Sequence, residues 1–514
     1  GSGVDFTNAA TLSAKNITVF GLANVSSGAA VRLSNLAILA GGGDLLVVGN
    51  NSNQSGDGVT LGYGTVANNA VGGSITFKSN NNINQTTAIG MVGNTSGHAA
   101  ALTYDVTTGT NASSVVGGNL TITGSSTSPI NYNLLASGAH LDGGALNIPG
   151  TITLDNTYGG TAGVGGTPTS GYITTANIAA AVAAEGISIN NAMTGANGIV
   201  IKGVSGTSNA VNTTATLTAT SGDILITGAS GSGIGYAGSG ALVATAGNVL
   251  MDGQSKTGSA INFSSTVTAN SGNVIITGLS ASLGNIWGTK ATGLISAKNI
   301  TVTGTNNTTD VSTAGGAVYL GALTIVAGGG NLLVTGNNSN QLSGGVYQTG
   351  AITDNANGGS ILFKSNNNIN HTGNISMVAN TSGQGSAVTY DVSTGGKSST
   401  IVSGNLTITA GSTSNIDFNQ YTAGATINPG VITVPGVITL DNTYGAATAG
   451  ATPVSGYLNA STLTTALVTS SGGITVSVRR EAAIGAMVLT WMPLLRPSSA
   501  RQLARPARPS LAAQ

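Results

Sequence analysis

Short runs of Val, Ile, Leu and Thr recur along most of the chain, and within each run apolar and polar side chains tend to alternate. Runs of this length and composition are typical of β-strands. Gly, Asn, Ser and Asp separate the runs, as expected for tight turns between strands. The pattern therefore predicts an all-β protein built from many short strands.

The middle of the chain repeats with a period of 25 residues. Gly222–Gly228, Gly247–Gly253 and Gly272–Gly278 share one pattern, and a second β-rich run precedes each of them. One such unit cannot bury its apolar side alone, whereas stacked units give every strand a neighbour and form one continuous core. We therefore predict a parallel β-helix, or β-solenoid, with two or three short strands in each coil.

A longer duplication surrounds this middle part. The motifs shared by the two copies are Ser13–Val19 with Ser296–Val302, Phe77–Asn84 with Phe363–Asn370, and Leu154–Gly159 with Leu440–Gly445. Copy one covers about residues 12–188, the 25-residue-period middle about 189–294, and copy two about 295–476. We therefore expect residues 1–476 to form a single solenoid with two homologous halves.

The composition of the 514 residues fits such a coil. The 80 Gly residues would supply corners with positive φ. Aromatic residues make up only 4%, and a thin interior favours small Ala, Val, Ile and Leu. The absence of Cys excludes disulfides and thiolate metal sites. Stacked Asn side chains can form hydrogen-bonded ladders along the axis. The candidates for such ladders are Asn80, Asn81, Asn82, Asn366, Asn367 and Asn368.

Two kinds of segment depart from the strand pattern. Thr174–Gly186 predicts a short helix, with Thr as N-cap, Ala in the interior and Gly at the end. The corresponding segment of copy two, Ala460–Val468, has a lower helix propensity. Residues 477–514 carry six Arg and four Pro, which predicts a disordered tail or a non-native junction, or alternatively a basic segment that lies on a membrane surface.

Charge and hydropathy narrow the function classes. Residues 1–476 carry nine basic and 14 acidic side chains, a balance that argues against nucleic-acid binding. No run of about 18 apolar residues indicates a transmembrane helix. The Gly233–Gly238 segment matches G-x-G-x-x-G, but a strand follows it instead of the helix that dinucleotide binding requires.

Four aspartates recur at matching places of the two copies. Asp105 and Asp391 stand in Thr-Tyr-Asp-Val, and Asp155 and Asp441 stand in Leu-Asp-Asn-Thr-Tyr-Gly. Glycosidases pair such acids for acid–base catalysis, but Asp beside Asn, Thr and Gly commonly caps a turn. We predict turn capping. His371 is replaced by Gln85 in copy one, which suggests a surface position. We therefore expect no catalytic residue, no cofactor and no metal.

The unit Thr-Ala-x-x-Gly-Asn-Val-x-Ile-Thr-Gly resembles the repeats of filamentous-haemagglutinin-like exoproteins, and so does the passage from Tyr172 to Ile189. The resemblance covers essentially residues 1–476. It implies a right-handed parallel β-helix on the bacterial outer surface or in the extracellular space, a rigid rod in adhesion, aggregation or biofilm formation. The implied partners are a host or bacterial surface glycan or protein, or a second copy. An outer-membrane secretion partner, which this chain does not encode, is also implied.

Three alternatives remain at this stage. A carbohydrate-active β-helix enzyme, such as a polysaccharide lyase or glycosidase, requires acids and bases clustered in a groove. An ice-binding or surface-binding solenoid requires a flat array of Thr-x-Thr in strict register. An amyloid-like chain without a single fold is disfavoured, because the long duplication keeps Tyr and Leu at matching places.

Overall fold

The computed structural model places most of the strand-forming residues. It describes residues 2–53, 56–92, 100–106, 114–116, 120–123, 130–136, 140–157, 186–281, 287–307, 315–339, 344–378, 386–392, 400–402, 405–409, 416–422, 426–428, 431–434, 436–441, 468–470 and 474–477. The chain divides into two compact units, Gly1–Arg479 and Arg480–Gln514, and the described residues all belong to the first. Within these residues every regular element is a strand, and all 46 strands belong to one sheet.

The strands stack in three columns, taken here in the order in which the chain visits them. The first column consists of β1 (Val4–Ala14), β3 (Ala29–Ile38), β5 (Asp57–Leu61), β8 (Asn82–Gln85), β11 (Ser114–Val116), β14 (His140–Asp142), β17 (Ile187–Ile189), β20 (Val211–Thr213), β23 (Tyr236–Gly238), β26 (Ile261–Phe263), β28 (Trp287–Ala291), β30 (Gly316–Leu320), β33 (Gly344–Gln348), β36 (Asn368–His371), β39 (Thr400–Val402) and β42 (Thr426–Asn428).

The second column is built from shorter strands. It consists of β6 (Thr65–Asn68), β9 (Ala88–Val92), β12 (Leu120–Thr123), β15 (Leu146–Ile148), β18 (Met193–Gly195), β21 (Leu217–Ala219), β24 (Leu242–Ala244), β31 (Leu323–Ile325), β34 (Ile352–Asp354), β37 (Ile375–Val378), β40 (Leu406–Thr409), β43 (Ile432–Val434) and β45 (Val468–Ser470). Parts of four longer strands, β1, β3, β27 (Val267–Ser280) and β29 (Ile295–Asn306), also run through it.

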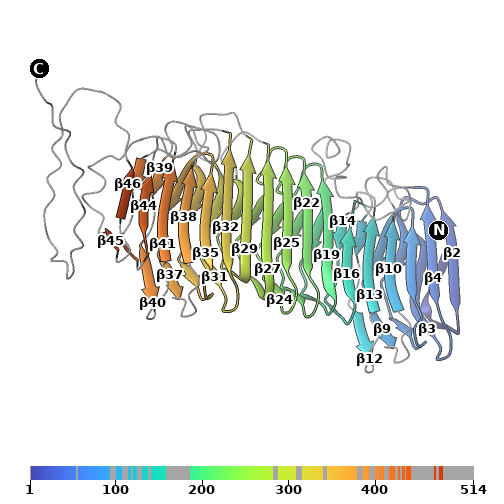
Figure 1. Cartoon of the computed structure of the whole chain (residues 1–514). Helices are drawn as coiled ribbons and strands as arrows, with labels where there is room; N and C mark the ends of the chain where they lie inside the picture. The colour runs from blue at the N-terminus through green and yellow to red at the C-terminus, as the bar shows by residue number, and fades with distance from the viewer. Residues whose placement is uncertain are drawn as a thin grey trace, which may run out of the picture. The chain divides into compact units, whose positions relative to one another are not determined.

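The third column is the most regular. It consists of β2 (Ile17–Ala23), β4 (Leu45–Asn51), β7 (Ile75–Ser79), β10 (Ala100–Val106), β13 (Ile130–Ala136), β16 (Thr151–Asp155), β19 (Gly198–Ser205), β22 (Ile224–Ser230), β25 (Val249–Ser255), β27, β29, β32 (Asn331–Asn338), β35 (Ser360–Ser365), β38 (Ser386–Val392), β41 (Ile416–Thr422), β44 (Ile438–Asp441) and β46 (Ile474–Ser477). Figure 1 shows these strands side by side in chain order.

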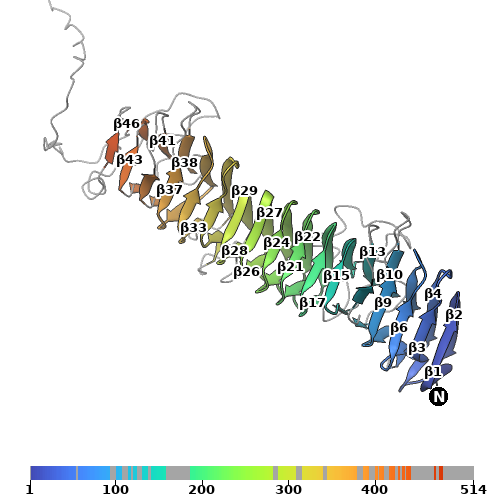
Figure 2. The same ribbon diagram turned by 90° about the horizontal axis from the view of Figure 1, so that it is seen from below.

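Each turn of the chain therefore contributes one strand to each column, as β5, β6 and β7 do, and every pairing between coils is parallel. Figure 2 shows strands of the first and second columns, such as β17 and β21, following one another in the same order. The predicted all-β fold and parallel β-solenoid are confirmed, and the right hand of the coil stays a prediction. The helix predicted at Thr174–Gly186 lies outside the described residues, apart from Gly186. Of the segment Ala460–Val468, only Val468 is described, as the first residue of β45.

The core lies inside the coils because alternate residues of each strand point inward. In β4 the burial alternates from Leu45 onward, and Leu45 and Val47 are buried. Ile226, Met251 and Ile276 stack directly on one another in the third column. One hydrophobic cluster continues in this way from Ile17 to Leu440. Full burial of one such side chain stabilises the fold by about 1.5–3 kcal/mol.

Ala, Val, Ile and Leu make up most of the core, as expected, and a few aromatic rings stack among them. In copy one Phe77, Tyr104 and Tyr132 are fully buried, with ring centroids 5.2 and 5.7 Å apart. In copy two Phe363, Tyr390 and Phe418 repeat the arrangement at 5.1 and 5.8 Å. Because the coils are in register, aromatic rings of successive coils lie above one another and together fill the interior of the solenoid.

A row of glycines marks the corner between the third and first columns. Its members are Gly203, Gly228, Gly253, Gly278, Gly304 and Gly336. A Cβ added to Gly228 would lie 2.0 Å from the carbonyl oxygen of Gly235, the residue just before β23 in the first column. Close backbone approach therefore requires glycine here. Positive φ, as the sequence predicts for corners, occurs elsewhere, for example at Gly41 and Gly328.

We predict that Gly228→Ala lowers the free energy of unfolding by about 1–3 kcal/mol, because the new methyl group overpacks the corner. Gly62→Ala is the matched control, since a Cβ at Gly62 meets nothing within 4 Å. Urea unfolding followed by circular dichroism measures both variants. Equal stabilities for the two variants would contradict the proposed role of the glycine row.

Candidate functional site

An outer ladder of Asp and Asn side chains links successive coils at the N-terminal ends of the third-column strands. The backbone N–H of Asn248 donates to Asp223 Oδ1 over 2.7 Å, and that of Asn273 donates to Asn248 Oδ1 over 2.9 Å. The ladder continues through Asn299 and Asn331, whose contact measures 2.8 Å. The rungs at Asn248, Asn273 and Asn331 each satisfy a backbone N–H, whereas Asn299 donates from its side-chain Nδ2 to Asn273 Oδ1 over 2.7 Å. Such a hydrogen bond contributes about 1 kcal/mol.

Copy one contains the same ladder in a shorter form. Asp44 N–H donates to Asn16 Oδ1, and Ser74 N–H donates to Asp44 Oδ1, both over 3.0 Å. The Gly-Asp or Gly-Asn pair before each repeated strand, as in Gly222-Asp223, was the sequence signal for this ladder. The sequence-based search chose the Asn runs instead.

The predicted Asn runs lie in corresponding turns of the two copies. Asn80 Oδ1 accepts a hydrogen bond from Asn51 N–H over 2.9 Å, and Asn366 Oδ1 accepts one from Asn338 N–H over 2.8 Å. The other members bond nearby: Asn81 Nδ2 to Gly56 O at 2.6 Å, Asn82 Nδ2 to Asp57 Oδ1 at 3.3 Å, and Asn367 N–H to Ser365 Oγ at 3.0 Å, while Asn368 begins β36. Asn80 and Asn366 thus connect their own coil with the preceding one.

A second ladder consists of buried serines at the C-terminal ends of the third-column strands, and the sequence analysis did not predict it. Ser230 Oγ donates to Ser208 O over 2.7 Å and accepts from Gly233 N–H over 2.8 Å. Ser255 repeats both contacts one coil later, at 2.7 Å each. The recurrence of Gly-x-Ser at the end of each repeated strand was the available signal.

The four predicted aspartates occupy different environments. Asp105 points outward from β10, and its carboxylate lies 3.3 Å from Lys78 Nζ. Asp391 has the matching place on β38, in register with Lys364. Asp155 is buried and accepts hydrogen bonds from the Thr157 backbone N–H and hydroxyl over 2.9 and 2.6 Å. Asp441 ends β44, in register with Tyr421 and Ser477.

These acids do not meet as a pair. Asp105, Leu135 and Asp155 lie in one row, with β13 between the strands that carry the two acids, so two strand spacings of about 4.8 Å separate Asp105 from Asp155. Burial raises the pKa of Asp155, while the hydrogen bonds from Thr157 and the charge of Lys202, 4.0 Å away, act in the opposite direction. Among the described residues, no group of three or more His, Asp and Glu side chains could together hold a metal ion.

A buried polar pair accompanies each aromatic stack. In copy one the Tyr104 hydroxyl donates to Gln85 Oε1 over 2.5 Å. In copy two His371 Nδ1 lies 2.7 Å from the Tyr390 hydroxyl, and its ring packs against Phe363 with centroids 5.4 Å apart. His371 is fully buried, so the prediction of a surface position is wrong. Burial lowers the pKa of His371 to about 4.

A second internal substitution places an acid where copy one has an amide. Asn68 Nδ2 donates to Gly43 O and Ser74 O, each over 3.4 Å. Asp354 occupies the matching position, beside the carbonyl of Gly330. Its Oδ2 has no hydrogen-bond partner in the described part of the chain, and burial raises its pKa to about 6. A protonated Asp354 could donate as Asn68 does, whereas a carboxylate would face a carbonyl oxygen.

The three stacked columns define the chain as a β-solenoid. No protein-family model, no curated protein and no solved structure matches the sequence. Among the residues that the structure describes, there is no helix that could span a membrane.

We predict that Asp354→Asn stabilises the protein above pH 6 by about 3 kcal/mol at most. Between about pH 4 and 6 the folded protein holds a proton that the unfolded chain has lost, so stability of the wild type falls as the pH rises through this interval. Urea unfolding at pH 4.5 and 7.5 measures the gain, which we expect only at the higher pH. The reciprocal control, Asn68→Asp, should cause the same loss of stability as the pH rises from about 4 to 6. A gain independent of pH would contradict titration of Asp354.

We predict the opposite slope for His371. Because its folded-state pKa is depressed, the wild type loses stability as the pH falls from about 6.5 to about 4. His371→Gln, which installs the copy-one residue, should remove this loss of about 3 kcal/mol at most and leave stability at pH 7.5 nearly unchanged. The same unfolding series tests it. Parallel curves for wild type and variant would show that His371 does not contribute to the pH dependence.

Proposed function

We propose that this chain is the structural and binding repeat region of a secreted, surface-exposed bacterial adhesin. The observation that carries the proposal is the continuous register of the third column from β2 to β46. Two polar ladders join its coils at both ends of the strands. A scaffold linked in this way holds outward side chains at fixed spacing, as a rod that resists bending at a surface must.

Binding by such a rod would be multivalent. One outward side chain follows another along the axis at about 4.8 Å, the strand spacing. A ligand that lies along the rod meets several of them at once, so weak contacts add through effective concentration. The repeat resemblance to filamentous-haemagglutinin-like exoproteins supports the same role, with a surface glycan, a surface protein or a second copy as partner. No catalytic step belongs to this proposal.

One observation favours a second candidate, binding to ice or another ordered surface. The outward positions of the second column form a hydroxyl row: Thr194, Thr218, Thr268, Ser296, Thr324, Thr353 and Ser376, interrupted by Val243. Strands such as β21 and β34 are three residues long, with one outward side chain each. The row is therefore one residue wide, narrower than the Thr-x-Thr array that this function requires.

We expect that cells displaying the full chain through an outer-membrane carrier aggregate and adhere to surfaces more than cells displaying the carrier alone. The physical reason is the sum of many weak contacts along the rod. Settling rate and attached biomass measure the effect at matched display levels. Folded, displayed protein that causes neither aggregation nor attachment would overturn the proposal. Thermal hysteresis of the purified chain would favour the second candidate instead.

A further inference from the structure

The outward row of the first column changes character in copy two. Lys290, Tyr319, Tyr347 and Asn370 follow one another in register on β28, β30, β33 and β36. Tyr319 and Tyr347 are the only side chains of β30 and β33 that are not buried. A file of polar and aromatic groups therefore runs along the axis on this face.

Trp287 joins the two tyrosines in one aromatic cluster. Its ring centroid lies 5.3 Å from that of Tyr319 and 5.5 Å from that of Tyr347, both in edge-on geometry. Its ring covers Gly316, where an added Cβ would lie 2.5 Å from Trp287 Cζ3. Thr349 donates a hydrogen bond from its hydroxyl to the Tyr319 hydroxyl over 3.3 Å. The rings are thus half-buried and held in place.

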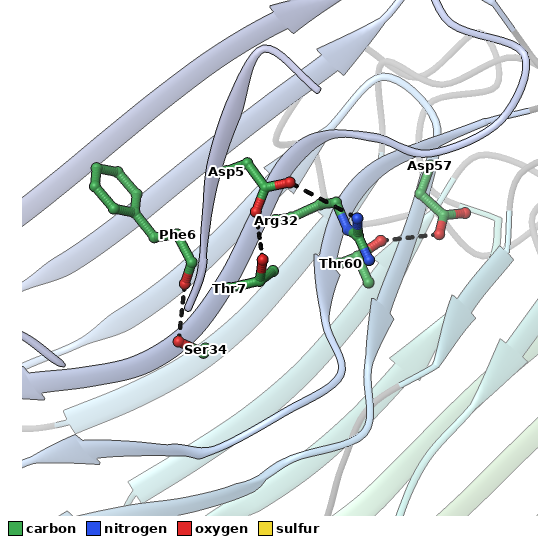
Figure 3. Close-up of polar contacts among 7 residues, drawn as sticks. All are labelled: Asp5, Phe6, Thr7, Arg32, Ser34, Asp57 and Thr60. Carbon is green, nitrogen blue, oxygen red and sulfur yellow. Dashed lines mark hydrogen bonds and ion pairs between the residues drawn. The ribbon is translucent and has the colours of Figure 1, made fainter. Parts of the chain in front are cut away.

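Copy one shows that the fold does not require these rings. The positions of Lys290, Tyr319, Tyr347 and Asn370 correspond to Asp5, Arg32, Thr60 and Asn84. There Arg32 forms an ion pair with Asp5 over 3.7 Å, and the Thr60 hydroxyl donates to Asp57 over 2.9 Å (Figure 3). Several buried neighbours are the same in both copies, such as Val31 and Val318, although Leu61 corresponds to the buried Gln348. The coil therefore also forms with Arg and Thr in this row, where Ala29 and Asp57 take the places of the ring-covered Gly316 and Gly344, so the solenoid can be built without these rings.

We propose that Trp287, Lys290, Tyr319, Tyr347 and Asn370 form a binding site for an extended neutral polysaccharide. A sugar ring offers an apolar C–H face, which packs on an aromatic ring, and a rim of hydroxyls, which needs hydrogen-bond partners. Trp and Tyr provide the first contact, and the amide, ammonium and phenol groups provide the second. Lys290 is the only charged side chain among the five, whereas a polyanion with a charge on each sugar would require several cations along the file, so we assign a neutral chain as the ligand.

The geometry favours a polymer over a protein partner. The file follows the axis with a step of about 4.8 Å, so a chain laid along it meets each side chain in turn. A stable protein–protein interface buries about 800 Å² on each partner. Strands β30 and β33 each contribute one side chain that is not buried, which makes a narrow line on this face. The inference rests on the proposed adhesive function and names the ligand class for one of its surfaces.

The chain supplies its own reporter for a test. It has two Trp residues, so Trp491→Phe leaves Trp287 as the only one. This protein is titrated with cellohexaose, laminarihexaose, chitohexaose and xylohexaose, and with hexagalacturonate as the acidic comparison. We expect saturable change of Trp287 fluorescence with at least one neutral hexasaccharide, and weaker binding of hexagalacturonate.

Variants that install copy-one residues separate binding from folding. Tyr319→Arg and Tyr347→Thr should each weaken saccharide binding at least tenfold, with an unchanged far-UV circular dichroism spectrum at the assay temperature. Tyr63→Ala is the matched control, because Tyr63 is a 67% exposed tyrosine in a turn of copy one. Binding that survives both cluster variants would place the site elsewhere and overturn the inference.

Three other results would also overturn it: no saturable binding of any neutral hexasaccharide, tighter binding of hexagalacturonate, or a dimer in sedimentation that the Tyr variants abolish. The last result would assign the row to self-association. The cell-display assay keeps this inference separate from the proposed function. Cells that aggregate although no saccharide binds would remove the ligand and leave the adhesive role intact. Saccharide binding without any aggregation or attachment would leave the ligand assignment intact and overturn the adhesive role.

Discussion

The structure depends on one constraint: each coil must keep the register of the coil on which it stacks. In a parallel pair, a slip of one residue would turn every inward side chain outward. The third column satisfies this constraint throughout, and Ile300, for example, pairs with Val274 on one side and Leu332 on the other. Equivalent positions therefore form continuous rows. The residue type at each position is constrained by its neighbours in the adjacent coils as well as by its own coil.

Differences in coil length are absorbed at the corners. Strands β27 and β29 pair in register from Val267 to Ala269 and again from Asn273, with a shift between Ala269 and Asn273. Asn273 still contacts Asn299 across that step, so the outer ladder continues. The polar ladders thus act where the chain bends and where unpaired backbone groups would otherwise accumulate. This division lets turns vary while the strands, and the core they enclose, remain aligned.

The sequence predicted the solenoid because its signal is local: short alternating runs, turn residues and a repeat length. The Ser230 ladder and the outer Asn248 ladder were missed because their partners lie about one coil away along the chain, so only the register between coils reveals them. His371 was misplaced for a related reason. Its exchange with Gln85 looks like surface variation, but both side chains bond a buried tyrosine, which tolerates either polar partner.

The duplication separates what the fold fixes from what it leaves free. Most inward rows keep their apolar side chains or exchange one polar group for another of similar size, as Asn68 and Asp354 do, although the buried Leu61 and Leu134 of copy one correspond to the buried Gln348 and Gln420 of copy two. Outward rows change more, from the Asp5–Arg32 ion pair to the Lys290–Tyr319 neighbours. A side chain that points away from the core and belongs to neither ladder is not needed for register, so selection for binding can act on it without loss of the coil. Function in this molecule is therefore best sought where the two copies differ on their outer faces.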